Sequence, residues 1–513
     1  MKIAKLDKKD QIIEQLNQEI EGLKCQIDEQ AKIIAAQSER LAILEPLEAK
    51  VVELEKTIEY LKAQLGQDSS NSSLPPSRDL KAPKPSPESL RDVLRPKDKK
   101  NKKKQGGQPG HKGANIKLPH EPNRRVQHWP AECEACPNLA ECSHNAKVES
   151  RRYVIQPRVE VDVIEHQRMK MVGCVRGMRR LTGTFPEKIK APIQYDEVLI
   201  AIVVVLSVYG AVSVQRIQEI LRGMYGIQIS TGTIQTMIKD CAALVRPTVE
   251  TDIKGRILEA LVANFDETST KVKGVKYWIH VAATKLLTYM TIHSKRGAEG
   301  TDANGVMPGL RGIAVHDCWK VYFGYLQCQH AVCCAHLLRE LKYIMKNLPD
   351  RKWCKRFFEY LLYMKKIKER NIAKGLKQVS AYHLKKFTQM YADIMALAHQ
   401  ECPADPPPPK NSIEAKKELP LIKRLERLES SVTLFMRNFD VPFDNNEAER
   451  AIRCVRIKTK SAGGFRGSGG EDYCTLMSYI NTGWKHGVNA FKALSEALAG
   501  NFQVIFGEPC TEN

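Results

Sequence analysis

The apolar residues near the start of the chain recur every three or four positions, as in a helix that buries one stripe against a partner. The pattern runs from Ile13 to Leu65, and its phase slips between Leu44 and Leu47, on either side of Pro46. It predicts a coiled coil that is interrupted near the proline. A single amphipathic helix folded back on the rest of the protein is the alternative that the same spacing allows.

Further along, short apolar runs of strand length are separated by turn residues. Helical spacing prevails over residues 195–245 and 342–440, and a proline-rich run at 403–409 breaks the second stretch. The predicted strands span residues 260–265, 276–284, 287–293 and 312–315, with a helical stretch at 297–309 before the last strand. Three consecutive strands, a helix and a further strand predict the mixed sheet of a ribonuclease-H-like fold within a multidomain α+β protein.

Two acidic residues end predicted strands, and a third acid lies in the first turn of a predicted helix. They are Asp266, Asp317 and Glu449. Mg²⁺ prefers oxygen ligands and takes few of them from protein, and two such ions about 4 Å apart can promote displacement at phosphorus. The three carboxylates therefore predict a Mg²⁺ or Mn²⁺ site, whereas each acid taken alone is more often a solvated strand end.

Other acids nearby compete for the same role. Glu267 follows Asp266, but adjacent residues on a strand point to opposite faces. Glu447 lies two residues before Glu449, about 200° around a helix, so the two cannot face one ion together. Asp444 is a third competitor.

Between the coil and the predicted sheet the composition changes twice. Residues 67–120 are rich in serine, proline, glycine and lysine, which predicts a mobile basic linker whose lysines either contact phosphates or only keep the chain in solution. A Cys-x-x-Cys turn then suits tetrahedral zinc. The candidate zinc ligands are Cys133, Cys136, Cys142 and either Cys174 or His144, and the alternative is a knuckle that packs without metal.

A pair of helical segments joined near Gly226 predicts a helix-turn-helix-like hairpin, although any helical hairpin with a glycine corner has the same pattern. Ser230 or Thr231 is suited to cap the second helix. The candidate DNA-binding residues on that helix are Thr231, Thr233 and Lys239.

A second basic group follows the third acid. Its members, Arg450, Arg453, Arg456, Lys458 and Lys460, are candidates for phosphate contacts, and a solvated helix face is the alternative.

Composition narrows the partner and the compartment. The 513-residue chain is too long for one core, and its net charge of +21 favours nucleic acid, although an anionic membrane surface would fit charge alone. No signal-peptide pattern opens the chain, and the longest apolar run, 198–208, is too short to cross a bilayer. Fifteen cysteines, an odd number, indicate reduced thiols or metal ligands. We expect a cytoplasmic protein with no membrane partner.

One further cluster, at Cys328–His336, contains a Cys-x-x-His pattern formed by Cys333 and His336. Without ligand spacing on a second segment, buried thiols and a packed histidine are the preferred interpretation of this cluster. Trp319 and Tyr322, after the second aspartate, fit core packing better than stacking on an unpaired base.

Several motifs in this order resemble a transposase of the insertion sequence 66 family, in the DDE superfamily. The resemblance covers nearly the whole chain. It rests on the coil, the cysteine knuckle and the motifs Asn71-Ser-Ser-Leu-Pro-Pro-Ser, Gly106-Gly-Gln-Pro-Gly-His-Lys-Gly, Asn446-Glu-Ala-Glu449-Arg, Gly463-Gly-Phe-Arg and Tyr479-Ile-Asn-Thr. Two positions depart from the family pattern: Gly177 stands where a second returning cysteine is expected, and His316 precedes the second aspartate.

The resemblance implies a ribonuclease-H-like core and metal-dependent DNA cleavage and strand transfer, with Asp266, Asp317 and Glu449 as the three acids. It also implies a homo-oligomer that acts on element ends and target DNA, with accessory proteins from the same element. A non-catalytic DNA-binding relative and a nuclease that cuts without joining are the competing hypotheses. The expected domains are a coiled coil at 1–66, a linker at 67–120, a cysteine-knuckle domain at 121–190, a helix-turn-helix-like domain at 191–250, the catalytic core at 251–345 and 441–486, a helical insertion at 346–440, and a C-terminal helix and tail at 487–513.

Overall fold

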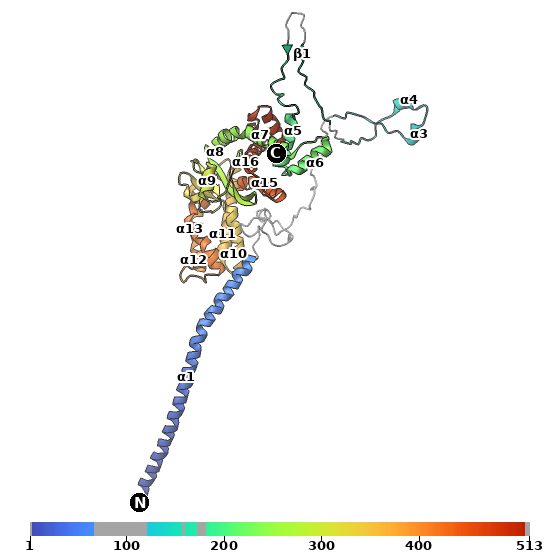
Figure 1. The fold of residues 1–513 in the computed structure, drawn as a ribbon. Coiled ribbons are helices and arrows are strands. Elements are labelled where there is room, and N and C mark those ends of the chain that lie inside the picture. Colours follow the sequence, from blue (N-terminus) through green and yellow to red (C-terminus); the bar gives the residue numbers. More distant parts are fainter. Residues whose placement is uncertain (1–2, 66–120, 156–159, 172–180, 508–513) are drawn as a thin grey trace. The chain divides into compact units, whose positions relative to one another are not determined.

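The computed structural model describes residues 3–65, 121–155, 160–171 and 181–507 (Figure 1). The chain divides into two compact units. One contains residues 1–87, 195–217 and 230–513, and the other contains residues 88–194 and 218–229. The linker predicted at 67–120 lies outside the described residues.

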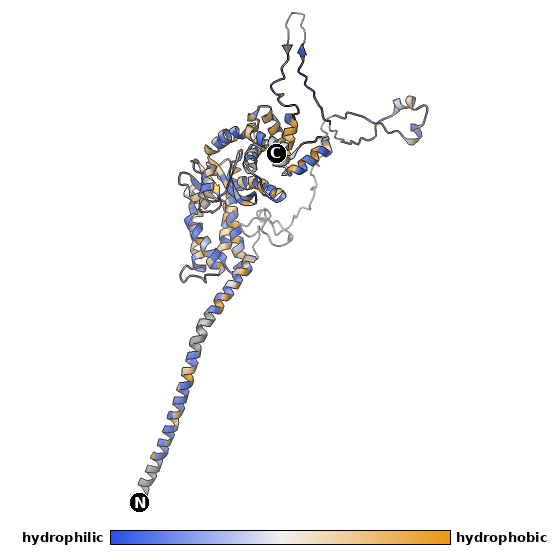
Figure 2. Cartoon of the chain, viewed as in Figure 1, coloured by the Kyte–Doolittle hydropathy of each residue, from blue (hydrophilic) through white to orange (hydrophobic). Residues whose placement is uncertain are grey.

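The first helix is longer than the sequence pattern suggested. α1 (Ile3–Leu65) is one α-helix, and it continues through Pro46, so the predicted interruption is wrong. Proline removes a single backbone hydrogen bond, and the turns on either side keep theirs. Apolar residues such as Ile20, Leu23 and Leu54 are exposed along α1, interspersed with hydrophilic ones (Figure 2). The stripe that predicts a coiled coil is therefore on the helix surface, and the coil itself stays a prediction.

A five-stranded mixed sheet forms the centre of the larger unit, which confirms the predicted α+β class. The strands are β3 (Val262–Val272), β4 (Val275–Ala283), β5 (Thr288–His293), β6 (Ile313–His316) and β7 (Gln329–Val332), in the spatial order β5-β4-β3-β6-β7. β3, β4 and β5 pair antiparallel, whereas β6 runs parallel to β3 and to β7. The sequence pattern missed β7 and ended β3 too early. The helix between β5 and β6 is α9 (Ala298–Asn304).

Two late helices cover the sheet. α15 (Asn446–Ala462) packs on β3 and β4, and α16 (Gly469–Lys485) packs on β5. Two hydroxyls of α16 accept hydrogen bonds from backbone N–H groups of the edge strand β5. Ser478 accepts from Met290 N at 2.9 Å, and Thr482 accepts from Thr288 N at 3.1 Å. Unpaired edge groups otherwise invite further strand pairing.

The glycine pair between these two helices has a steric reason. Gly464 has φ +109°, and a Cβ there would lie 2.3 Å from the carbonyl oxygen of Lys271. The close approach lets Phe465 N donate to Lys271 O at 2.8 Å, while Lys273 N donates to Phe465 O at 2.9 Å. The loop is thereby fastened to the end of β3.

A helical segment lies in sequence between β7 and α15, as predicted. Its helices are α10 (Cys334–Asn347), α11 (Lys352–Ile372), α12 (Ala381–Glu401), α13 (Leu419–Arg427) and α14 (Glu429–Arg437), with a π-helical turn at Glu414–Glu418. The buried Glu418 carboxylate accepts from Trp353 Nε1 at 2.7 Å and pairs with Arg351 at 3.1 Å. These contacts join the start of α11 to the start of α13.

Helices also precede the sheet. They are α5 (Glu197–Val204), followed by a π-helical turn at Val205–Tyr209, α6 (Val214–Tyr225), α7 (Thr231–Pro247), a π-helical turn at Thr248–Ile253 and α8 (Lys254–Leu258). Ser230 caps α7, since its hydroxyl accepts from Thr233 N at 3.0 Å. At the other end of the unit, α17 (Ala490–Leu498) packs on α5 and α16.

The described residues of the smaller unit contain little regular structure. Besides residues 218–225 of α6, they form α3 (Ala131–Glu134), α4 (Leu139–Cys142), a 3₁₀ turn at Ser143–Asn145 and a pair of two-residue strands, β1 (Lys170–Met171) and β2 (Leu181–Thr182). Neither α3 nor α4 has a buried residue. Across the described helices of both units, none is both long enough and apolar enough to cross a membrane.

Candidate active site

Asp266 lies within β3, and Asp317 directly follows β6, the neighbouring parallel strand. β3 and β6 run parallel, with Asn264 opposite Val315. Asp266 lies two residues beyond Asn264, and Asp317 lies two residues beyond Val315, so continuing the register past this last pair would bring the two aspartates opposite each other. The sequence predicted this neighbourhood from two strand ends, and Asp317 does follow the end of β6, but Asp266 lies within β3, which continues to Val272.

Glu449 reaches the same region from α15, in the first turn of that helix. Asn445, directly before the helix, is buried and fixes its start to β3. The Asn445 amide accepts from Asn264 Nδ2 at 2.9 Å and donates to Phe265 O at 2.7 Å. The sequence indicates no role for either asparagine, because a short motif does not show which strand it will contact.

The pKa values of the two aspartates are raised by burial and by neighbouring acids. Burial, and then the charges of Glu267, Asp317 and Glu449, hold the pKa of Asp266 well above its usual value. Burial and the nearby Glu267 likewise raise the pKa of Asp317 to about 6. Each aspartate accepts one backbone bond that lowers its pKa, from Glu267 N and from Trp319 N, both at 2.8 Å.

Glu267 has a different environment from Asp266. It is buried, and its carboxylate accepts from Arg296 Nε at 2.8 Å and from Tyr322 Oη at 2.6 Å. The Arg296 guanidinium also lies over the ring of Trp319, 4.5 Å from its centroid. Glu267 is therefore paired with protein groups, and Tyr322 is a core residue, as the sequence favoured.

The competing acids on the α15 side also face elsewhere. Glu447 pairs with Lys485 at 3.2 Å and lines a cavity together with Asp444. None of the residues that line this cavity is Asp266, Asp317 or Glu449. Glu447 and Glu449 therefore point to different sides of α15, as expected for residues two positions apart on a helix.

The proposed acid set suits divalent cations chemically. Two partly buried aspartates with raised pKa values lie beside further carboxylates, and such burial is costly unless a cation compensates the charge. The ligand oxygens of the three acids are not all within 4.8 Å of one another, judged over the described residues. A site that binds two ions about 4 Å apart distributes its ligands over a wider space than a one-ion site.

The candidate phosphate-binding residues on α15 do not all face outward. Arg450, Arg453 and Lys460 are exposed, and Arg456 is half-buried. Lys458 is buried, and its ammonium donates to Ser207 O at 2.7 Å. The prediction that Lys458 contacts phosphate is therefore wrong, because its helical position faces the protein core.

On α7, Thr231 and Lys239 are exposed, while the hydroxyl of Thr233 lies 2.8 Å from that of Ser230 at the helix cap. Their DNA-binding role stays a prediction.

The cysteine knuckle is only partly described. Cys133 is half-buried, Cys136 and Cys142 are exposed, and Cys174 lies outside the described residues. His144 Nδ1 lies 3.3 Å from Glu141 O. In the described part of this segment, no three candidate ligand atoms come within 4.8 Å of one another. Zinc binding here stays a prediction.

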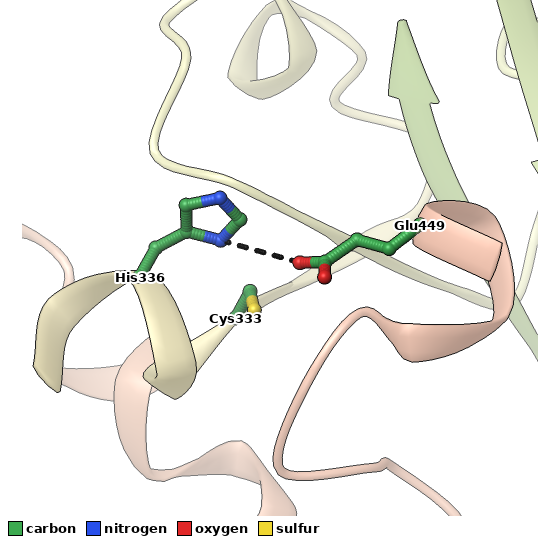
Figure 3. Close-up of side chains that lie close together, drawn as sticks. All are labelled: Cys333, His336 and Glu449. Carbon is green, nitrogen blue, oxygen red and sulfur yellow. Dashed lines mark ion pairs between the residues drawn. The ribbon is translucent and has the colours of Figure 1, made fainter. Parts of the chain in front are cut away.

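A different cysteine and histidine do come together with an acid. Cys333, His336 and Glu449 bring one potential ligand atom each within 4.8 Å of one another (Figure 3). From the sequence, packing was the preferred interpretation of this Cys-x-x-His pair, because its third member is distant in sequence. The Cys-x-x-His spacing was the one sequence feature that indicated a metal site here.

Two family models match the chain. The model described as "Transposase IS66 family" matches residues 192–472, more than half of the chain, and a family of unknown function, DUF6444, matches residues 5–117. No curated protein was found to match. The first match covers the described sheet, α15, and all three candidate acids. The chain therefore belongs to the transposase IS66 family.

Proposed function

We propose that this transposase binds the ends of an insertion sequence and catalyses metal-dependent DNA cleavage and strand transfer through Asp266, Asp317 and Glu449. The observation that carries the proposal is the register of β3 and β6, which, continued past their last pair, would bring the two aspartates opposite each other while α15 brings Glu449 to the same strand. Three antiparallel strands followed by strands parallel to the first support a ribonuclease-H-like core.

The chemistry consists of two successive displacements at phosphorus. Water releases a 3′-hydroxyl at the element end, and that hydroxyl then attacks the target strand. Neither displacement needs a nucleophilic side chain, which agrees with a candidate site made of acids. Mg²⁺ or Mn²⁺, held by the three acids, would activate the attacking oxygen and stabilise the leaving one.

The protein's own contribution is to hold the acids in place. The backbone amides of Glu267 and Trp319 each donate to one oxygen of an aspartate, which orients the carboxylate. The buried Asn445 keeps the first turn of α15 against β3, so that Glu449 stays near the aspartates. Second-layer hydrogen bonds of this kind orient metal ligands in many sites.

DNA is the partner that the charge supports. Arg450, Arg453 and Lys460 extend from the same helix as Glu449 and are exposed to contact phosphates. Self-association through α1, accessory proteins of the same element and zinc in the cysteine knuckle belong to the same proposal. A monomeric mass that persists at high protein concentration without DNA would count against α1 as an oligomerisation element.

The test is a strand-transfer assay on labelled DNA that carries the element's own ends, with Mg²⁺ or with EDTA. Wild-type protein is compared with Glu449→Gln and with the matched control Glu447→Gln, whose side chain pairs with Lys485 instead. We expect joined products only with metal, a loss of cleavage and joining in Glu449→Gln, and retention of both in Glu447→Gln. Equal activity in the two variants would refute the assignment of the third acid. Cleavage without joining would favour the nuclease alternative.

A further inference from the structure

Cys333, His336 and Glu449 come from two segments of the larger unit that are far apart in sequence. Cys333 directly precedes α10, His336 lies in its first turn, and Glu449 lies in the first turn of α15. Two backbone bonds position Cys333 and its neighbour: Cys333 N donates to His316 O at 2.8 Å, and Cys334 N donates to Phe443 O at 3.0 Å. The side chains point toward one another (Figure 3).

Two atoms of this group lack hydrogen-bond partners. His336 Nδ1 and Glu449 Oε1 are both buried and unpaired, and they lie 3.9 Å apart. The dashed line in Figure 3 marks this close approach, which is too long for a hydrogen bond between the imidazole and the carboxylate. A buried polar atom without a partner costs about 1–3 kcal/mol. One cation placed between the two atoms would give both of them a partner.

An arginine offers part of the compensation. Arg339 Nη2 lies 3.5 Å from Glu449 Oε1, where it supplies charge without making a hydrogen bond to that oxygen. It leaves His336 Nδ1 without a partner. Arg339 thus compensates the charge of the buried Glu449 carboxylate, but it does not account for the buried His336 Nδ1.

We propose that Cys333, His336 and Glu449 bind a transition-metal ion of the Zn²⁺ class, with water in a fourth position. Thiolate, imidazole and carboxylate are all zinc ligands, and three protein ligands with one open position form a common tetrahedral set. Mg²⁺ avoids thiolate, so this site differs in kind from the oxygen site proposed at Asp266 and Asp317. In a tetrahedral set with bonds of about 2.0–2.3 Å, the ligand atoms are roughly 3.3–3.7 Å apart, so atoms now within 4.8 Å of one another would approach by up to about 1.5 Å on binding.

Binding must also displace a proton. Burial and the nearby Glu449 raise the pKa of the Cys333 thiol, and an ion has to replace that proton to bind sulfur. If the proposed function holds, an ion bound here draws on the acid that the strand-transfer site uses, so zinc would compete with the reaction. The binding test below contains no DNA, and its result is separate from that consequence.

The experiment titrates Co²⁺, a spectroscopic substitute for Zn²⁺, into metal-free, reduced, full-length protein. All variants carry Cys133→Ser and Cys136→Ser, which removes the ligand pair of the cysteine knuckle. We expect one equivalent of Co²⁺ with a thiolate charge-transfer band, and displacement of the band by Zn²⁺ but not by Mg²⁺. Adding Cys333→Ser should abolish the band, and adding His336→Gln should weaken binding at least about tenfold.

Cys334→Ser is the matched control. Cys334 is buried beside Cys333, but its thiol donates to the carbonyls of Val332 and Val432, so this variant should keep the band. Circular dichroism checks that each variant is folded. If Cys333→Ser fails to fold, His336→Gln and Glu449→Gln, which retain the thiol, take its place. An unchanged band in folded Cys333→Ser, or the absence of any thiolate band in the parent protein, overturns the proposal.

Discussion

Two regions of this chain carry cysteines at metal-ligand spacing, and they differ in what surrounds the thiols. Cys133 and Cys136 lie in a segment of short helical turns that have no buried residue, and Cys136 is exposed. Cys333 is buried beside the sheet, and the fold brings His336 and Glu449 to it. Within the described residues, the Cys133-x-x-Cys136 segment, whose spacing is more typical of a zinc site, is thus less well packed than the group around Cys333.

The difference teaches what local spacing can predict. Two thiolates in one turn specify half of a site, and the other half depends on whether a second segment folds against them. At Cys333 the second segment is α15, which buried polar contacts fasten to β3. If the region around Cys333, His336 and Glu449 is the more rigidly held of the two, substitutions there should have larger effects than substitutions near Cys133 and Cys136.

The largest expected effect is on the chemistry of the sheet region. We expect Asp266→Asn to lower strand cleavage and joining by at least about 10³-fold, because it removes a candidate metal ligand. Folding stability should stay equal or rise, because the variant removes a buried charge that lies among other acids. Labelled-DNA assays and urea unfolding measure the two quantities. A large fall in the urea midpoint would instead assign Asp266 a structural role.

The next effect is on stability, with one asparagine from each region as a matched pair. Asn445→Ala leaves the amide of Asn264 and the carbonyl of Phe265 without that partner, which should cost about 2–4 kcal/mol of unfolding free energy. Asn138, before α4, is exposed and makes no side-chain capping bond, so Asn138→Ala should change stability by less than about 0.5 kcal/mol. Urea unfolding compares the two, and equal costs would contradict the difference in organisation.

The sequence predicted the sheet better than it predicted the site. Short apolar runs of strand length located β3, β4, β5 and β6, since strand pattern is a local property. β7 was missed because its four residues, Gln329–Val332, do not form such an apolar run. The burial of Lys458 was missed for a different reason: charge indicates a partner, but only the packing of α15 shows which face is buried.

The three candidate acids were found from sequence motifs. The contacts that hold them in place were not. Neither the Asn264–Asn445 contact nor the approach of Glu449 to Cys333 can be read from spacing, because each joins segments more than 100 residues apart. Long-range contacts of this kind depend on the whole fold.

A smaller expected effect separates the thiols by reactivity. In EDTA, an alkylating reagent should modify Cys136 and Cys142 at least about 100-fold faster than Cys333 and Cys354, because buried thiols react only after local opening. Burial also raises the pKa of Cys333, which lowers its thiolate fraction further. Peptide mass spectrometry after timed quenching gives the rates. Comparable rates at Cys136 and Cys333 would remove the distinction between the two regions.

The smallest expected effect concerns the pH at which the acids take up a cation. The pKa of Asp317 in the folded protein is raised from 3.8 to about 6. For the metal-free protein, this carboxyl favours folding while it is protonated, and its contribution is lost as the pH rises from about 4 to about 6. Mg²⁺ binds the ionised form, so its affinity should rise as the pH rises over the same range. At pH 5, where about one carboxyl in eleven is ionised, Mg²⁺ should bind about tenfold more weakly than at pH 8. Calorimetry at fixed Mg²⁺ should therefore show a larger rise in melting temperature at pH 8 than at pH 5. The raised pKa of Asp266 acts in the same direction.

Asp317→Asn should reduce the Mg²⁺-induced rise in melting temperature at both pH values, whereas Cys333→Ser should leave that rise intact, since a thiol is a poor ligand for Mg²⁺. An equal rise at the two pH values would mean that Mg²⁺ binds elsewhere on the chain, and the sheet region would then have no better claim to an organised metal site than the exposed cysteine segment.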